Sequence, residues 1–244
     1  MKTKIILVLT DGRSGSTNLI KLFENFKNIT VCSELFNEND VYSSKYEKDL
    51  IIKKYGEKYL EKTTDPKYHL EILKYLSENS NKEFFIFKIM LFQTTSEFLE
   101  KMIKDNLIYH IIILERKNMI DKFISQRKAE LLNKWQSYDT TNTKIKFNII
   151  NYGWYKKYRI NLHKEYFRLL KKNYKYYTYI EYNETINFDS IIKKIKGMFP
   201  ELILKDNSNK CLKIQDKSKN YNDKIENYDE VKDFIEEELK TFNI

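Results

Sequence analysis

The stretch KIILVLTDGRSGSTNL, Lys4–Leu19, joins an apolar run to a helical pattern through a short polar loop. Ile5–Leu9 is continuously apolar, which is typical of a strand buried on both faces of a parallel sheet. Apolar residues resume at helical spacing over Thr17–Phe26, which predicts an amphipathic helix. Gly12–Thr17 therefore connects a buried strand to a helix N-terminus, which is the layout of a phosphate-binding loop.

This loop offers several donors to an anion. Its backbone N–H groups can converge on one ligand, and the helix N-terminus adds partial positive charge. Ser14, Ser16 and Thr17 add hydroxyl groups, and Arg13 adds a permanently charged fork of donors. There is no Gly-Lys pair, so the loop is not the Walker A motif of nucleoside triphosphatases. The structural alternative is an ordinary turn in which a Ser or Thr hydroxyl only caps the helix.

Strand and helix patterns alternate along the rest of the chain. Further strands are predicted at Thr30–Ser33, Glu83–Met90, Asn106–Glu115 and Tyr174–Tyr182. Helices are predicted at Thr94–Lys104, Asn118–Leu132, Phe147–Lys172, Phe188–Met198 and Tyr228–Phe242, with two more between Tyr46 and Ser80 that break at Pro66. The alternation favours an α/β fold with a parallel sheet and helices on both faces. No repeat or composition shift divides the chain, so we expect one domain over residues 1–244.

Composition and charge narrow the function classes. The chain has 244 residues, of which 41% are hydrophobic and 32% charged, an ordinary balance for a soluble globular protein. Its net charge of +9 fits a Lys-rich solvated surface, and it also fits an anionic cofactor, an acidic glycan or nucleic acid as partner. Zinc-finger spacing and the aromatic signature of RNA-recognition motifs are missing, so nucleic acid is not expected. The sequence does not set the oligomeric state.

The cysteines and the N-terminus bear on the compartment. Cys32 and Cys211 are far apart and form no CxxC motif, which suggests a reducing compartment. Lys2 and Lys4 precede the apolar run as in a signal peptide, but that run is shorter than a signal-peptide core and the following Asp-Gly-Arg is a poor cleavage site. No stretch approaches the length of a transmembrane helix. We therefore expect a cytoplasmic protein.

Arg13-Ser14-Gly15-Ser16-Thr17 resembles the 5′-phosphosulfate-binding loop of sulfotransferases that use PAPS (3′-phosphoadenosine 5′-phosphosulfate). That loop follows the first strand and has the form [KR]-[ST]-G-[ST]-[ST]; the variant with Arg is similar to bacterial glycolipid and Nod-factor type enzymes. The resemblance implies a three-layer α/β/α fold related to P-loop NTPases. It also implies sulfuryl transfer to a hydroxyl of a carbohydrate or glycolipid, with adenosine 3′,5′-bisphosphate as product. Cofactor contacts would then include Arg13, Ser14, Gly15, Ser16, Thr17 and the adjacent Asn18.

A second segment, LERKNMIDKFISQRKA (Leu114–Ala129), suits the other phosphate of this cofactor. Arg116 ends a strand and Ser125 lies on the next helix, so both are expected at the ligand crevice beyond the carboxyl ends of the sheet. A bidentate Arg and a hydroxyl donor match a phosphate dianion. In the family, an Arg and a Ser in these places hold the 3′-phosphate. The alternative is that Arg116 and Lys117 only solvate a helix start.

Two further residues are candidates for the chemistry. Ser33-Glu34-Leu35-Phe36-Asn37 resembles the family segment whose Glu is the proposed general base, and Arg13 would then stabilise charge on the leaving oxygens. The alternative is that Glu34, a single Glu after a short strand, is only a solvated residue. Lys88, within an apolar strand, needs an anionic partner. It either reaches the crevice and helps to bind the sulfuryl group or extends to water from the edge of the sheet.

Histidine is a base in other sulfotransferases, so a His is the alternative to Glu34. His110 is expected to be a packed, hydrogen-bonded residue of a core strand, and His69 and His163 have no motif around them. No two of these histidines have metal-ligand spacing, and the reaction needs no metal. We therefore expect no metal ion.

The C-terminal segment KIQDKSKNYNDKIENYDEV, Lys213–Val231, is similar to the closing region of the family, where a basic loop covers the cofactor. Lys213, Gln215 and Lys217 are the candidates for cofactor contact, and a solvated basic tail is the alternative. Two rival functions stay open. One is a nucleotide or nucleoside kinase with an altered loop, and the other is a catalytically silent anion- or glycan-binding module with the same fold.

Overall fold

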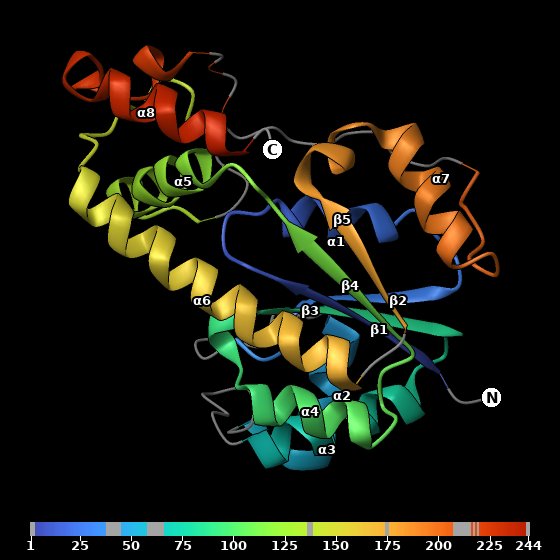
Figure 1. Cartoon of the computed structure of the whole chain (residues 1–244). Coiled ribbons are helices and arrows are strands. Elements are labelled where there is room, and N and C mark those ends of the chain that lie inside the picture. Colours follow the sequence, from blue (N-terminus) through green and yellow to red (C-terminus); the bar gives the residue numbers. More distant parts are fainter. Residues whose placement is uncertain are drawn as a thin grey trace.

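A computed structural model describes residues 3–37, 45–57, 66–135, 139–173, 176–206, 216, 218 and 220–242. Its centre is a sheet of five parallel strands in the order β2-β3-β1-β4-β5 (Figure 1). The strands are β1 (Lys4–Thr10), β2 (Ile29–Glu34), β3 (Phe84–Met90), β4 (His110–Glu115) and β5 (Tyr177–Glu181).

Helices connect the strands. They are α1 (Ser16–Phe23), α2 (Lys45–Tyr55), α3 (Pro66–Asn79), α4 (Ser96–Lys104), α5 (Met119–Leu132), α6 (Ile149–Asn173), α7 (Phe188–Met198) and α8 (Tyr228–Phe242). Short 3-10 helices occur at η2 (Leu91–Gln93), η3 (Tyr182–Ile186) and η4 (Tyr221–Asp223). In the described ranges, no helix has the combination of length and apolar character that crossing a bilayer requires.

The alternation of side chains along β1 produces the layers. Leu7 and Leu9 face one side of the sheet, where they pack with apolar residues of α2, α3, α4 and the C-terminal part of α6. Ile6 and Val8 face the other side, where α1 and α7 cover the sheet. Because β1 is buried on both faces, its sequence is apolar without interruption from Ile5 to Leu9. The predicted α/β fold, with a parallel sheet between helical layers, is confirmed.

A third apolar cluster fixes α6. Near its beginning, Tyr152 of α6 packs with Phe123 of α5 and Ile235 of α8, whereas Tyr166 and Leu170 near its end belong to the core of the sheet. Figure 1 shows α6 as a long diagonal helix that runs from the region of α5 toward α4. Its middle part is therefore held between two clusters.

Most of the differences from the predicted elements are at their ends. The helix predicted over Thr17–Phe26 stops at Phe23, because the N–H groups of Asn25 and Phe26 bond three residues back and the Asn25 amide also donates to the Leu22 carbonyl at 3.0 Å. The strand predicted from Asn106 begins only at His110, since Asn106 has a φ of 51° and turns the chain after α4. His110 bonds Thr178 at 3.0 Å, as expected of a packed residue.

Candidate active site

The loop between β1 and α1 has a conformation that depends on glycine. Gly15 has a φ of 77° and is the N-cap of α1, and no side-chain hydroxyl caps this helix. A Cβ at Gly15 would lie 2.5 Å from two ring carbons of Tyr182, the first residue after β5. The Tyr182 ring therefore lies directly against the loop, which only glycine allows. The capping role that could have explained the hydroxyls is absent at this described helix end.

Ser14 is an unsatisfied donor within this loop. Its side chain is buried, and its Oγ has no hydrogen-bond partner among the residues that the structure describes. Buried polar atoms in folded proteins are nearly always paired, so an unpaired hydroxyl in this loop needs an explanation. An anionic ligand held by the loop would supply the missing partner, and the donor set therefore fits a phosphate or sulfate group.

Arg13 joins the loop to α5. Its Nε donates to Ser125 Oγ at 2.9 Å, and its NH1 donates to the Trp135 carbonyl at 2.6 Å. Burial lowers the pKa of Arg13, and the positive charge of Arg116 lowers it further. Arg116 lies over the ring of Tyr182 at 4.6 Å and pairs with Asp121 at 3.1 Å. The structure thus brings the predicted residues Arg13, Arg116 and Ser125 together, with two like charges close enough to affect each other.

Glu34 and Lys88 form a buried pair beside the same loop. Lys88 Nζ lies 3.2 Å from Glu34 Oε1 and donates to Thr17 Oγ1 at 3.2 Å and Ser16 Oγ at 3.4 Å. The two residues face each other across β2 and β3, next to an irregularity of β2 that shifts the register before Glu34. Because β3 is an interior strand and the Lys88 side chain is fully buried, the alternative that Lys88 extends to water is wrong.

The other oxygen of Glu34 is also occupied. Its Oε2 accepts hydrogen bonds from Asn37 Nδ2 at 2.7 Å and from Gln93 Nε2 at 2.9 Å. Burial would raise the pKa of Glu34, but the charge of Lys88 and the two amides outweigh burial and lower it. The carboxylate is therefore ionised at neutral pH and only weakly basic, while the best general bases titrate near the working pH.

Asp11, which the sequence did not single out, holds the loop in place through hydrogen bonds to neighbouring elements. Lys122 of α5 donates to its Oδ2 at 2.6 Å, Arg159 of α6 donates to its Oδ1, and the Gly12 N–H donates to Oδ1 at 2.6 Å. Burial would raise the pKa of Asp11, but His163, Lys122 and Arg159 together lower it to about 2. This one carboxylate therefore ties the loop to two helices.

His163 belongs to the same cluster, although no motif surrounds it in the sequence. Its Nε2 is 3.6 Å from Asp11 Oδ2, and its Nδ1 is 3.7 Å from Glu115 Oε1. The other oxygen of Glu115 accepts a hydrogen bond from the Tyr179 hydroxyl. The signal that could have found this cluster is the four-residue spacing of Tyr155, Arg159 and His163, which places them on one face of the predicted helix.

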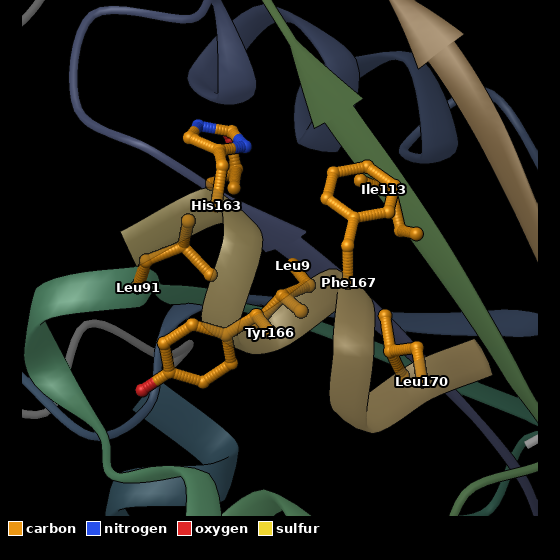
Figure 2. A pocket seen from close by; sticks show the side chains of 8 residues that line it. Leu9, Leu91, Ile113, His163, Tyr166, Phe167 and Leu170 are labelled. Atoms are coloured by element: carbon orange, nitrogen blue, oxygen red, sulfur yellow. The ribbon is translucent and has the colours of Figure 1, made fainter. Parts of the chain in front are cut away.

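A small cavity beside His163 does not extend the site. Figure 2 shows its lining by side chains from β1, β4, η2 and α6, which are mostly apolar: Leu9, Leu91, Ile113, Phe167 and Leu170. The Tyr166 hydroxyl points away from it and donates to the Thr94 carbonyl at 2.6 Å. Thr10 and His163 also line the cavity, but this mostly apolar lining is not a set of converging donors of the kind that holds an anion.

The remaining predicted contacts are placed only in part. Asn18 lies in the first turn of α1, where its N–H donates to the Gly15 carbonyl at 3.0 Å. Lys213, Gln215 and Lys217 lie outside the described residues. From the same segment, Asp216 accepts from Lys128 of α5 at 2.7 Å. The described part of the chain contains no group of three or more His, Cys, Asp or Glu side chains that could hold a metal ion.

Comparison with known proteins identifies the fold. No protein-family model matches the sequence, and no curated protein matches it either. Among solved structures, the chain is similar to the sulfotransferase domain from the curacin biosynthetic pathway, with a TM-score of 0.53 and 11% sequence identity over 90% of this chain and 81% of that domain. At this identity the likeness shows the fold alone, a parallel sheet flanked by helices.

Proposed function

We propose that this chain is a sulfotransferase that moves a sulfuryl group from PAPS to a hydroxyl of a carbohydrate or glycolipid acceptor. The observation that carries the proposal is the bond from Arg13 to Ser125, which joins the loop after β1 to α5 with Arg116 beside it. Two anion sites, one in the loop and one at the end of β4, thereby become neighbours, as a donor with two separate phosphate positions requires. The sulfotransferase fold of the similar structure agrees with this assignment.

The hydrogen-bond donors of the site divide into two groups, one for each phosphate position of the nucleotide. The N–H groups of residues 13–17 and the unpaired Ser14 hydroxyl would hold the 5′-phosphosulfate, and Arg116 with Ser125 would hold the 3′-phosphate. When bound, PAPS supplies an activated sulfuryl group. Lys213, Gln215 and Lys217 complete the proposed cofactor contacts from the C-terminal segment.

The chain's own residues divide the remaining work. Arg13 would neutralise charge that develops on the leaving phosphate oxygens, and Lys88 would act beside it from β3 through its position at Ser16 and Thr17. Glu34 would accept the proton of the acceptor hydroxyl. Since Lys88 and two amides hold the Glu34 carboxylate in its ionised form, proton acceptance becomes easier if one of these partners turns to the substrate.

One observation favours the kinase alternative. The loop itself contains no lysine. Lys88 of the neighbouring strand β3 nevertheless brings an ammonium group to Ser16 and Thr17 of the loop. A kinase would nevertheless need ATP with Mg²⁺, and the carboxylate at the end of β4 is Glu115, which accepts from Tyr179. Ligand preference therefore separates the two functions.

The test is a thermal-shift comparison of adenosine 3′,5′-bisphosphate with ATP and Mg²⁺. A ligand at a hundred times its Kd stabilises the native state by about 2.7 kcal/mol, which raises Tm by about 5–10 °C in a chain of this length. We expect that rise with the bisphosphate. A rise with ATP and Mg²⁺ and none with the bisphosphate would refute the sulfotransferase assignment.

A variant of Glu34 distinguishes an enzyme from a catalytically silent binding module. Glu34→Gln should keep the affinity for the bisphosphate and lose turnover with PAPS and an acceptor panel of sugars and glycolipids. If the wild-type protein binds the bisphosphate but sulfates no hydroxyl compound, the binding-module alternative is correct.

A further inference from the structure

Tyr155, Arg159 and His163 lie four residues apart on α6, and the middle part of α6 faces the loop after β1. Arg159 and His163 both contact Asp11, and the Arg159 guanidinium lies over the Tyr155 ring at 5.0 Å. A Cβ at Gly12 would lie 3.5 Å from an Arg159 nitrogen, so this face of the helix touches the loop backbone. Residues of α6 therefore form one wall of the candidate site.

Each of these three side chains has a buried polar atom that lacks an ordinary hydrogen bond. Four buried side-chain atoms of the described residues have no hydrogen bond of ordinary length and angle: Tyr155 Oη, Arg159 Nε, the loop atom Ser14 Oγ and His163 Nε2, the last of which lies 3.6 Å from Asp11 Oδ2. Their concentration at one place differs from the pattern of scattered exceptions that folded proteins show. Arg159 Nε can only donate a hydrogen bond, and the Tyr155 hydroxyl can donate as well as accept one, so an acceptor is the kind of partner that would satisfy both.

The charges around Tyr155 indicate which kind of acceptor this is. Burial raises the pKa of Tyr155 to about 12, although the positive charges of Arg159 and Arg116 lower it, so the hydroxyl is protonated at neutral pH. Arg13 also lies close enough to interact with Tyr155 electrostatically. The Tyr155 side chain thus interacts electrostatically with three guanidinium groups and with one carboxylate, that of Asp11, so positive charge predominates around it.

Packing alone does not explain the hydroxyl. The Tyr155 ring contacts the Phe123 ring with centroids 5.4 Å apart, a contact that phenylalanine would make equally well. Tyr152, three residues earlier, shows the ordinary arrangement, because its hydroxyl donates to Glu238 at 2.8 Å. A buried hydroxyl without a partner lowers the stability of the free protein, so its presence suits a ligand-bound state.

We propose that the Tyr155 hydroxyl and Arg159 Nε donate hydrogen bonds to phosphate oxygens of the bound nucleotide, so that α6 completes the anion site formed by Arg13, Arg116 and Ser125. The nature of the nucleotide rests on the proposed function. The assignment of Tyr155 and Arg159 rests on the unpaired atoms. Tyr155 is thereby a binding residue, whereas Arg159 also fixes the loop through Asp11.

The test compares two tyrosine variants of the same helix. Tyr155→Phe removes an unpaired hydroxyl, so the Tm of the free protein should stay the same or rise slightly, while the Kd for adenosine 3′,5′-bisphosphate, measured by calorimetry, should rise about tenfold or more. Tyr152→Phe removes a hydroxyl bonded to a carboxylate, so Tm should fall by about 3–6 °C with the Kd within twofold of the wild-type value.

Each outcome decides the matter. If the wild type binds the bisphosphate and Tyr155→Phe binds it equally well, α6 does not contact the nucleotide, and the proposed function stands without this inference. If Tyr155→Phe lowers the Tm of the free protein as much as Tyr152→Phe does, its hydroxyl has a structural role and the inference is wrong. If the wild type itself binds no bisphosphate, both the proposed function and this inference fail.

Discussion

Replacing Asp11 with Asn tests whether this carboxylate holds the loop to α5 and α6. The variant keeps the size of the side chain and removes its charge. Lys122, whose ammonium is fully buried, would lose an ion pair of 2.6 Å, and Arg159 would lose its partner as well. Removing one member of a buried ion pair costs about 3–5 kcal/mol, because the remaining charge stays buried without compensation. We expect a loss of this size in the free energy of unfolding at pH 5.

The pKa of Asp11 makes this loss depend on pH. Its pKa falls from an ordinary 3.8 to about 2 in the folded protein. A carboxyl whose pKa is lower in the folded state stabilises the protein above its unfolded pKa and loses this stabilisation as the pH falls toward its folded pKa. The full contribution is about 2 kcal/mol, of which about 1 kcal/mol is lost by pH 3. The difference between wild type and Asp11→Asn should therefore be about 1 kcal/mol smaller at pH 3 than at pH 5.

Urea unfolding of both proteins at pH 5 and pH 3 measures this difference. Burial lowers the pKa of His110 to about 4, within this window, but His110 is common to both proteins, so the difference between them reports mainly on Asp11. Asp105→Asn is a matched control, because Asp105 forms a partly exposed pair with Lys74 at 3.5 Å and its loss should cost less than about 1 kcal/mol. If Asp11→Asn costs no more than this control, Asp11 does not organise the loop.

Three further predictions follow from contacts of the loop. Lys88→Met should cost about 3–5 kcal/mol in urea unfolding, and adding Glu34→Gln should restore part of that loss; a strictly additive double variant would show that the pair is not coupled. Gly15→Ala should destabilise the protein by about 1–3 kcal/mol, because Gly15 has a φ of 77° and its Cβ would meet the Tyr182 ring. The variant should also bind the bisphosphate more weakly in calorimetry. A variant with the Tm and Kd of the wild type would contradict this loop conformation. Ser125→Ala should raise the Kd for the bisphosphate about tenfold with little change in Tm, and an unchanged Kd would remove Ser125 from the site.

Local sequence patterns predicted the parts of the fold that depend on local physics. Residues Ile5–Leu9 of β1 are apolar without interruption because both faces of the strand are covered. Helix α3 begins at Pro66, as expected because proline suits a first helical turn. Strand order depends on which strands pair across the sheet, and a single sequence does not contain this information. For this reason the sequence left two positions open for the Lys88 side chain, the crevice and the edge of the sheet. The place of β3 between β2 and β1 excludes the edge.

The same division holds for the site. The loop residues lie together in one short motif, and Arg116 and Ser125 lie in another, so the sequence indicated them. The contact between Asp11 and Arg159 joins residues 148 positions apart. It forms because apolar clusters at both ends of α6 hold the helix beside the loop, and such packing follows from the tertiary structure alone. For this reason a helix without a motif, α6, contributes three side chains that the sequence did not indicate: Tyr155, Arg159 and His163.

The cations around the loop have two different physical roles. Lys88 and Lys122 are fully buried and lie 3.2 Å and 2.6 Å from the carboxylates of Glu34 and Asp11, so their charge is largely compensated within the protein. Arg13 and Arg116 instead repel each other: burial lowers the pKa of Arg13 most, and the charge of Arg116 lowers it further, although Asp121 pairs with Arg116 at 3.1 Å. An anion bound there relieves their repulsion. The affinity for a phosphate ligand should therefore depend on these two arginines and on the α6 donors, far more than on the net charge of +9 that is spread over the whole chain.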